Sequence, residues 1–136
     1  MLTNLNYDRL IRFQRSKRTL LTLSLCHVYN PTQVGLAGID DQGQVIRFLE
    51  KPEPEEVFTD LANSGILICE PAILSHIPQG TLWDVGHDLL PDLLGTGEPL
   101  HGLPLAPDEY LIHIGTIENY ERAQHEWPEV QAHPSS

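Results

Sequence analysis

The sequence predicts an α/β domain in which helices flank a mixed sheet. Apolar runs of strand length alternate with amphipathic stretches of helical period along most of the chain. The run TLLTLSLCHVY, residues 19–29, is apolar or small on both alternating faces, which is typical of a strand covered on both sides. Residues 35–52 contain a strand, a DDQG turn and a second strand, and so predict an antiparallel hairpin.

Length and charge limit the classes of protein that the chain can represent. Its 136 residues suffice for one domain with a core. The net charge of -11, from 19 acidic and 8 basic residues, argues against nucleic acid or an anionic membrane as partner. No apolar run approaches the ~20 residues of a membrane span, and no leader peptide opens the chain. Cys26 and Cys69 are far apart and lie in apolar runs, which predicts buried free thiols and a cytoplasmic location.

The first half of the chain begins with a helix. Residues 6–18, NYDRLIRFQRSKR, have Asn6 as a candidate N-cap and basic residues at the end, where they suit the helix dipole. The strand and hairpin follow, and LANSGILIC, residues 61–69, predicts a further strand. Asp40 and Asp41 are assigned to turn chemistry, because the spaced oxygen ligands of a calcium loop are absent.

The second half predicts two short strands and three helices. EPAILSHI is a short helix, and DVGHDLLPDLLGTG is a helix that kinks or restarts at Pro91. LHGLPL and EYLIHI are short strands. The last helix has Thr116 as N-cap and an expected inward face of Ile117, Tyr120, Ala123 and Trp127. We expect a domain over residues 1–127 and a tail over residues 128–136.

The opening helix has no strand before it, although parallel α/β domains are built from strand-helix-strand units. Two explanations fit. Either upstream sequence is lost, or the chain is an ordinary α+β domain that starts with a helix.

Three short motifs contain candidate functional residues. Glu50 and Lys51 stand at a strand end before Pro52, where a carboxylate could accept from hydroxyls and an ammonium could meet a phosphate. Asn63, in NSG, offers donors and an acceptor for hydroxyl recognition. His113 ends a strand before a glycine turn, as a metal ligand or base could. Taken singly, each motif has a simpler structural explanation: EKP is an exposed pair, Asn63 is a turn residue and His113 is a structural histidine.

Familiar catalytic motifs are missing from the sequence. It has no GxSxG, no HExxH, no Walker loop and no GxGxxG, so it has no recognisable device for cradling a nucleoside triphosphate.

The motifs taken in order are far more specific than any one of them. IDxxGxVxxFxEKP, NSGIxIxEP, DLLPxLL and IGTxENYxRA follow one another between Leu2 and Ala123. This series resembles the sugar-1-phosphate nucleotidylyltransferases, especially the mannose-1-phosphate or heptose-1-phosphate guanylyltransferases. The resemblance implies an incomplete Rossmann-like layer sandwich. It also implies an enzyme family that joins a sugar 1-phosphate to a nucleoside triphosphate with magnesium and releases pyrophosphate.

The resemblance also implies roles for individual residues. Glu50 would bind sugar hydroxyls, Lys51 would neutralise the sugar phosphate, Asn63 would lie at the sugar, and the backbone of Gly35 would pass close to it. No catalytic residue is assigned within this chain.

Two departures from the family pattern matter. The family's GxGTRL nucleotide loop and first metal-binding aspartate should precede Leu2, so the chain resembles the sugar-binding remainder, whether as a fragment or as a short natural product. His113 occupies the position of the aspartate that usually binds the second magnesium ion. Magnesium prefers oxygen ligands, so we expect weak or absent Mg2+ binding here.

These departures predict that the chain retains only the sugar 1-phosphate side and is inactive alone, since nucleoside triphosphate binding would need the missing part. The alternative is a non-catalytic sugar-phosphate-binding or association module. Missing strands would leave an exposed sheet edge, so a homo-oligomer is expected.

Overall fold

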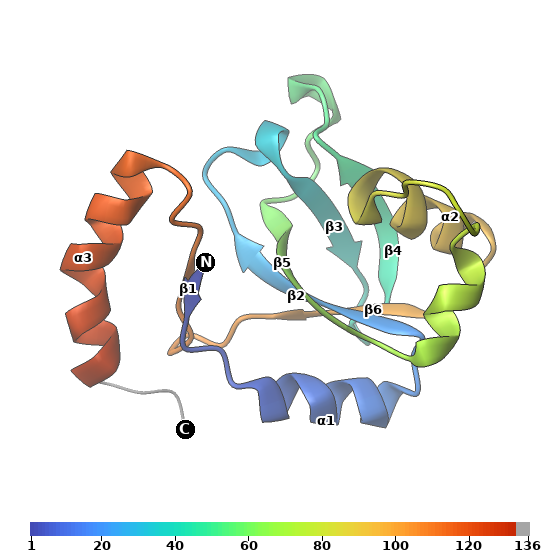
Figure 1. Cartoon of the computed structure of the whole chain (residues 1–136), viewed down its shortest axis with the longest axis horizontal. Helices are drawn as coiled ribbons and strands as arrows, with labels where there is room; N and C mark the ends of the chain where they lie inside the picture. The colour runs from blue at the N-terminus through green and yellow to red at the C-terminus, as the bar shows by residue number, and fades with distance from the viewer. Residues whose placement is uncertain (133–136) are drawn as a thin grey trace. The chain divides into compact units, whose positions relative to one another are not determined.

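The computed structural model describes residues 1–132, which form two compact units (Figure 1). The larger unit spans Leu10–Pro104, and the smaller combines Met1–Arg9 with the chain from Leu105 onward. Residues 133–136 of the expected tail lie outside the described residues. No helix within residues 1–132 combines the length and the apolar character needed to cross a bilayer.

Five strands form the sheet of the larger unit, in the order β4-β3-β5-β2-β6. β2 pairs parallel with β6 and antiparallel with β5, while β3 pairs antiparallel with both β4 and β5. The predicted mixed sheet is therefore confirmed, with the hairpin inside it. The strand bounds are Leu21–His27 (β2), Gly35–Ile39 (β3), Val45–Glu50 (β4), Leu61–Cys69 (β5) and Leu100–Pro104 (β6).

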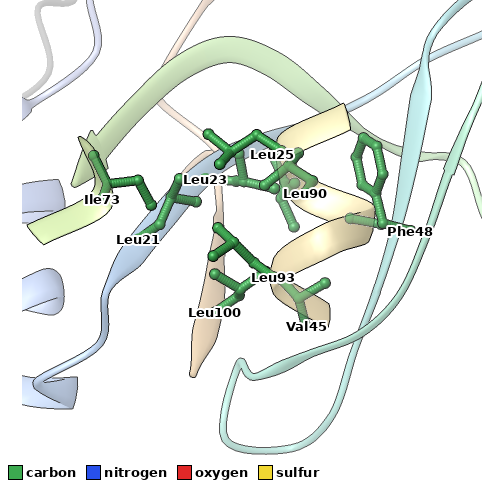
Figure 2. Close-up of a cluster of buried hydrophobic side chains, with 11 residues drawn as sticks. Leu21, Leu23, Leu25, Val45, Phe48, Ile73, Leu90, Leu93 and Leu100 are labelled. Atoms are coloured by element: carbon green, nitrogen blue, oxygen red, sulfur yellow. The ribbon is translucent and has the colours of Figure 1, made fainter. Parts of the chain in front are cut away.

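Short helical segments cover one face of this sheet. A single-turn π-helix, Val85–Leu89, leads directly into α2, Leu90–Gly95. Pro91 lies in the first turn of α2, where its missing N–H costs no hydrogen bond, so the predicted restart is confirmed. Figure 2 shows the apolar cluster beneath these segments. Its buried members are Leu21, Leu23, Leu25, Ala37, Val45, Phe48, Ile73, Leu89, Leu90, Leu93 and Leu100.

The opposite face of β2 carries buried hydroxyl groups, and α1, Tyr7–Lys17, supplies a partner for one of them. Asn6 caps this helix as predicted, with its Oδ1 accepting from Arg9 N at 3.1 Å. Gln14 is buried and donates to the Thr19 carbonyl at 2.8 Å, and it accepts a hydrogen bond from the Thr22 hydroxyl. The Thr22 hydroxyl thus has a partner supplied by a helix, whereas the buried hydroxyl of Ser24 has none among residues 1–132.

The turn between β3 and β4 uses its aspartate as predicted. Asp40 Oδ1 accepts from the backbone N–H groups of Gln42 and Gln44, both at 2.9 Å. Gly43 follows with a φ of 78°, a left-handed conformation that glycine adopts without strain. The carboxylate of Asp40 is therefore committed to the turn.

The smaller unit differs from several sequence expectations. The expected strand over EYLIHI is limited to β7, Leu111–Ile112, which pairs antiparallel with the unforeseen β1, Leu2–Thr3. α3 runs from Ile117 to Ala132, so residues 128–132 of the expected tail are helical. Ile117 and Tyr120, expected to face inward, are 80% and 53% exposed, and of the expected inward face only Ala123 is buried.

EPAILSHI forms the expected short helix, which is a 3-10 helix, Pro71–His76. A smaller expectation fails at the cysteines. Both cysteines are free as expected, but only Cys26 is partly buried, whereas Cys69 is exposed at the end of β5. A strand end has fewer neighbours than a strand centre, so the apolar run around Cys69 does not ensure its burial.

The smaller unit is held together by the carboxylate of Glu109. Its oxygens accept from Ala106 N and Asn6 N, each at 2.7 Å, and from the Arg9 guanidinium. The Glu109 side chain is fully buried in this arrangement. Burial raises the pKa of Glu109, but the two backbone hydrogen bonds and Arg9 outweigh burial, so its pKa lies below the ordinary value.

We predict that Glu109→Gln lowers the free energy of unfolding of this unit by about 3 kcal/mol, because it replaces the buried negative charge that faces the Arg9 guanidinium with a neutral amide. The lowered pKa means that the wild-type carboxylate stabilises the fold above pH 4.5, its ordinary pKa, and that this stability is lost as the pH falls through the folded-state value. Urea unfolding followed by Trp127 fluorescence in a Trp83→Phe background measures both effects. Glu121→Gln, an exposed acid on α3, is the control. A Glu109→Gln variant as acid-sensitive as the wild type would contradict the assignment.

Candidate functional site

Three of the residues singled out in the sequence lie at one end of the sheet, on one face. Glu50, the last residue of β4, pairs with Gly35, the first residue of β3. Leu36 pairs with Ala62, and in that antiparallel register Gly35 and Asn63 are the next pair. Asn63 is also opposite Leu25 of β2. Residues paired across a sheet share a face, so the Glu50 and Asn63 side chains lie on the face that carries the leucine core.

The carboxylate of Glu50 is packed between two glycines. A Cβ built on Gly35 would lie 2.6 Å from Glu50 Oε2, and one built on Gly86 would lie 2.7 Å from Glu50 Cδ. Both distances are shorter than any ordinary Cβ contact, so the space that Glu50 occupies exists only because both residues lack side chains. Glu50 is partly buried, and its carboxylate has no hydrogen bond or ion pair with any other residue from 1 to 132.

Lys51 follows in a strained conformation. Its φ is 46°, in the left-handed region that L-residues rarely adopt, and Pro52 after it is buried. The Lys51 N–H still donates to the carbonyl of Val34, the residue before β3, at 3.0 Å. The backbone at Lys51 is therefore still hydrogen-bonded to the neighbouring segment. The regular alternation of the strand therefore ends at Glu50. The Lys51 side chain is exposed and forms no ion pair within the described part of the chain.

Asn63 lies at an irregularity in β5. Leu23 pairs with Leu67 and Leu25 with Asn63, so Ser64, Gly65 and Ile66 bulge opposite the single residue Ser24. Gly65 takes a φ of 90°, and its N–H donates to Asn63 Oδ1 at 3.0 Å. The amide nitrogen of Asn63 finds no acceptor among residues 1–132, so its two N–H donors remain available to a ligand.

Gly86 is the residue that sequence reasoning missed. It lies in the π-helix and is buried against Glu50, far away along the chain. The only available signal was a glycine inside the helical pattern DVGHDLL, a position where glycine weakens a helix and so often has a packing reason. Nothing in the pattern indicated which residue it contacts.

His113 belongs to the smaller unit, where its main chain has a structural role. The His113 carbonyl accepts from Asn119 Nδ2 at 2.8 Å, and the Thr116 hydroxyl accepts from Asn119 N at 3.1 Å. IGTxEN is thus the start of a helix, with Thr116 capping α3 as predicted. The imidazole itself is exposed. Residues 1–132 contain no group of three or more His, Cys, Asp or Glu side chains placed to hold a metal ion.

The sequence pattern of the nucleotidyl transferase family matches residues 1–129. The chain belongs to this family. Two similar family members are a UTP–glucose-1-phosphate uridylyltransferase of Synechocystis sp., 31% identical over 124 residues, and a mannose-1-phosphate guanylyltransferase of Mycobacterium tuberculosis, 32% identical over 123 residues. Each match covers 90% of this chain but only 31% and 33%, respectively, of the relative. The chain thus spans about a third of the length of these relatives.

A solved structure confirms the nucleotidyl transferase fold. A Bacillus anthracis protein described as a glucose-1-phosphate thymidylyltransferase superposes with a TM-score of 0.74 at 19% identity. The match covers 91% of this chain and 50% of that protein.

We predict that Lys51→Gly and Arg18→Gly each raise the free energy of unfolding by roughly 0.5–1 kcal/mol. Both residues have left-handed φ values, 46° and 51°. The strain of this conformation costs an L-residue more free energy than glycine loses through its greater freedom in the unfolded chain. Arg18 is the matched control, because it has the same backbone strain outside the candidate site. Chemical denaturation of the three proteins measures the effect. A loss of stability confined to Lys51→Gly would show that the lysine side chain offsets its own strain.

Proposed function

We propose that this chain is the sugar 1-phosphate-binding part of a nucleotidyl transferase. The main support is the Glu50 carboxylate, which is partly buried, held between two glycines and without a hydrogen-bond partner in residues 1–132. Keeping a partly buried charge unpaired costs stability, and such a cost is expected where a ligand supplies the partner. Sugar hydroxyls are suitable partners, because an ionised carboxylate only accepts hydrogen bonds.

Neighbouring groups complement this carboxylate. Asn63 keeps two N–H donors for a further hydroxyl. The space beside the Cα of Gly35 is filled by the Glu50 carboxylate and the Phe48 ring, so a sugar would meet Gly35 through its backbone groups. The exposed ammonium of Lys51 would neutralise the phosphate. Glu50, Gly35 and Asn63 occupy adjacent strands, and Lys51 follows Glu50 directly. One sugar 1-phosphate could therefore engage all four residues.

In an intact enzyme, this site would present the sugar phosphate to a nucleoside triphosphate, with transfer of the nucleotidyl group and release of pyrophosphate. The relatives are named for glucose 1-phosphate with UTP and for mannose 1-phosphate, so the shared chemistry is that of a sugar 1-phosphate. We assign this role to a domain within residues 1–127, of the kind that operates in sugar nucleotide biosynthesis.

The resemblance to the family implies magnesium, but the described residues do not fit a magnesium site. His113 offers one imidazole where hard oxygen ligands are preferred, and residues 1–132 contain no group of three or more His, Cys, Asp or Glu side chains placed to hold a metal ion. The sequence also has no glycine-rich loop for a triphosphate. We therefore assign no catalytic step to these residues, and we propose that the 136-residue chain alone binds a sugar phosphate without turning it over.

We predict that the 136-residue chain binds mannose 1-phosphate or glucose 1-phosphate, and that Glu50→Gln weakens this binding about tenfold to a hundredfold. The reason is that a charge-assisted hydrogen bond contributes about 1.5–3 kcal/mol. Isothermal titration calorimetry without nucleotide measures the affinity. Glu55→Gln, which removes an equal charge from an exposed position nearby, is the control and should bind like the wild type.

Two results would contradict the proposal. One is equal loss of affinity in Glu50→Gln and Glu55→Gln, which would indicate a general charge effect. The other is release of pyrophosphate when the purified chain is mixed with a nucleoside triphosphate, a sugar 1-phosphate and Mg2+, which would show turnover.

We also propose that the chain forms a homo-oligomer, which an apolar surface of the smaller unit favours. Ile114, Tyr120 and Trp127 line a groove of about 250 Å³ together with Leu2, Ala123, Gln124 and Pro128. Ile117, beside it on α3, is 80% exposed. Exposed apolar surface of this kind on a strongly charged protein is typical of contact sites.

We predict that the chain runs as a dimer or larger species in multi-angle light scattering and that Ile117→Asp shifts it toward monomer. Burial of an unpaired charge at the contact would cost more free energy than the apolar contact contributes. Glu118→Gln, at the next position on the helix, is the control. A monomeric wild type at all concentrations tested would contradict the proposal.

A further inference from the structure

Gly86, like Gly35, is a buried glycine whose missing side chain leaves room for the Glu50 carboxylate of the candidate site. The π-helix that carries Gly86 is fixed in place from both ends. At its start, Asp84 Oδ1 accepts from His87 N and Asp88 Oδ2 accepts from Asp84 N, both at 2.8 Å. At its end, Leu89 and Leu90 are buried in the core. The backbone at Gly86 therefore cannot retreat without breaking these contacts.

Glu50 depends on this position of the backbone. The three heavy atoms nearest to a Cβ on Gly86 all belong to Glu50: it would collide with Oε2 and with Cδ, at 2.7 Å, and would contact Cγ at 3.4 Å. All three atoms belong to the outer part of a flexible side chain, whereas the π-helix is anchored. Steric conflict at residue 86 would thus be resolved by movement of the Glu50 carboxylate and not by movement of the fold.

We propose that Gly86 is a positioning residue, which sets where the Glu50 carboxylate meets the hydroxyls of a bound sugar phosphate. The inference rests on the proposed function and adds a residue from a different segment to the site. Gly86 touches no ligand in this proposal, since it acts only through the side chain of Glu50. The π-helix places Gly86 beside Glu50. Its wide turn comes directly before α2, whose leucines are buried in the core.

The two glycines around Glu50 are not equivalent. A Cβ on Gly35 would also lie 2.5 Å from Cζ of the Phe48 ring, which belongs to the core. Gly35→Ala would therefore disturb the core as well as the carboxylate, and a loss of binding could reflect either. Gly86→Ala separates the two effects, because the three heavy atoms nearest to its Cβ position all belong to Glu50 and none to the Phe48 ring.

The test is a double-mutant cycle with mannose 1-phosphate and inorganic phosphate as probes. Gly86→Ala is introduced into the wild-type chain and into Glu50→Ala. We expect Gly86→Ala to weaken mannose 1-phosphate binding about tenfold in the wild type and to have no effect in Glu50→Ala, where no carboxylate is displaced. Weak binding of inorganic phosphate, followed by NMR titration, should be unchanged, because Lys51 and not Glu50 faces the phosphate.

Gly95→Ala is the control. Gly95 also lies in a helical segment without a left-handed φ, but no heavy atom lies within 4 Å of its Cβ position. It should bind both probes like the wild type. Two results would overturn the inference and indicate general damage to the fold. One is equal weakening of mannose 1-phosphate binding by Gly86→Ala with and without Glu50. The other is loss of inorganic phosphate binding together with loss of sugar phosphate binding.

The same cycle, measured by thermal unfolding without ligand, separates failure of this inference from failure of the proposed function. A coupling between residues 50 and 86 in melting temperature, together with no binding of any sugar phosphate by the wild type, would refute the proposed function and the positioning role, while confirming the packing. Wild-type binding that Gly86→Ala leaves intact would refute only the inference.

Discussion

The larger unit depends on the burial of β2 on both faces. Leu21, Leu23 and Leu25 are fully removed from solvent on one face, and each such side chain stabilises the fold by about 1.5–3 kcal/mol. Thr22, on the other face, is buried as well, and it requires the hydrogen bond that Gln14 of α1 provides. A sheet with this central strand needs a layer on each side. The π-helix and α2 provide one layer, and α1 provides part of the other.

That requirement places the candidate site. Because α2 must cover the leucines of β2, the π-helix before it comes to rest over the neighbouring end of β4, against Glu50. Several local rules of folding are broken at this end of the sheet. A carboxylate is left without a partner, a lysine adopts a left-handed conformation, and β5 bulges around Gly65. Such a concentration of local costs is typical of functional sites, where a ligand offsets them.

Sequence reasoning succeeded where a residue's environment is dictated by its own segment. The strand ending at His27, the DDQG turn and the caps Asn6 and Thr116 follow from periodicity or from a side chain bonding to nearby backbone. It failed where environment depends on distant segments. The expected inward face of α3 is largely exposed, because an apolar stripe indicates what a helix can bury and not what is available to cover it. β1 and β7 are too short to produce an alternating pattern, so their pairing was not foreseen.

The sequence by itself determined the order of the main helices and strands, the mixed sheet and, through the ordered motifs from IDxxGxVxxFxEKP to IGTxENYxRA, the membership of the nucleotidyl transferase family. It also named Glu50, Lys51 and Asn63, because motif residues keep their spacing along the chain. Only the tertiary structure decided that Gly86 lies against Glu50 and that the carboxylate has no partner in the described residues. The reason is physical: both facts concern the space between two segments that meet only after the core has formed, and no local pattern encodes that space.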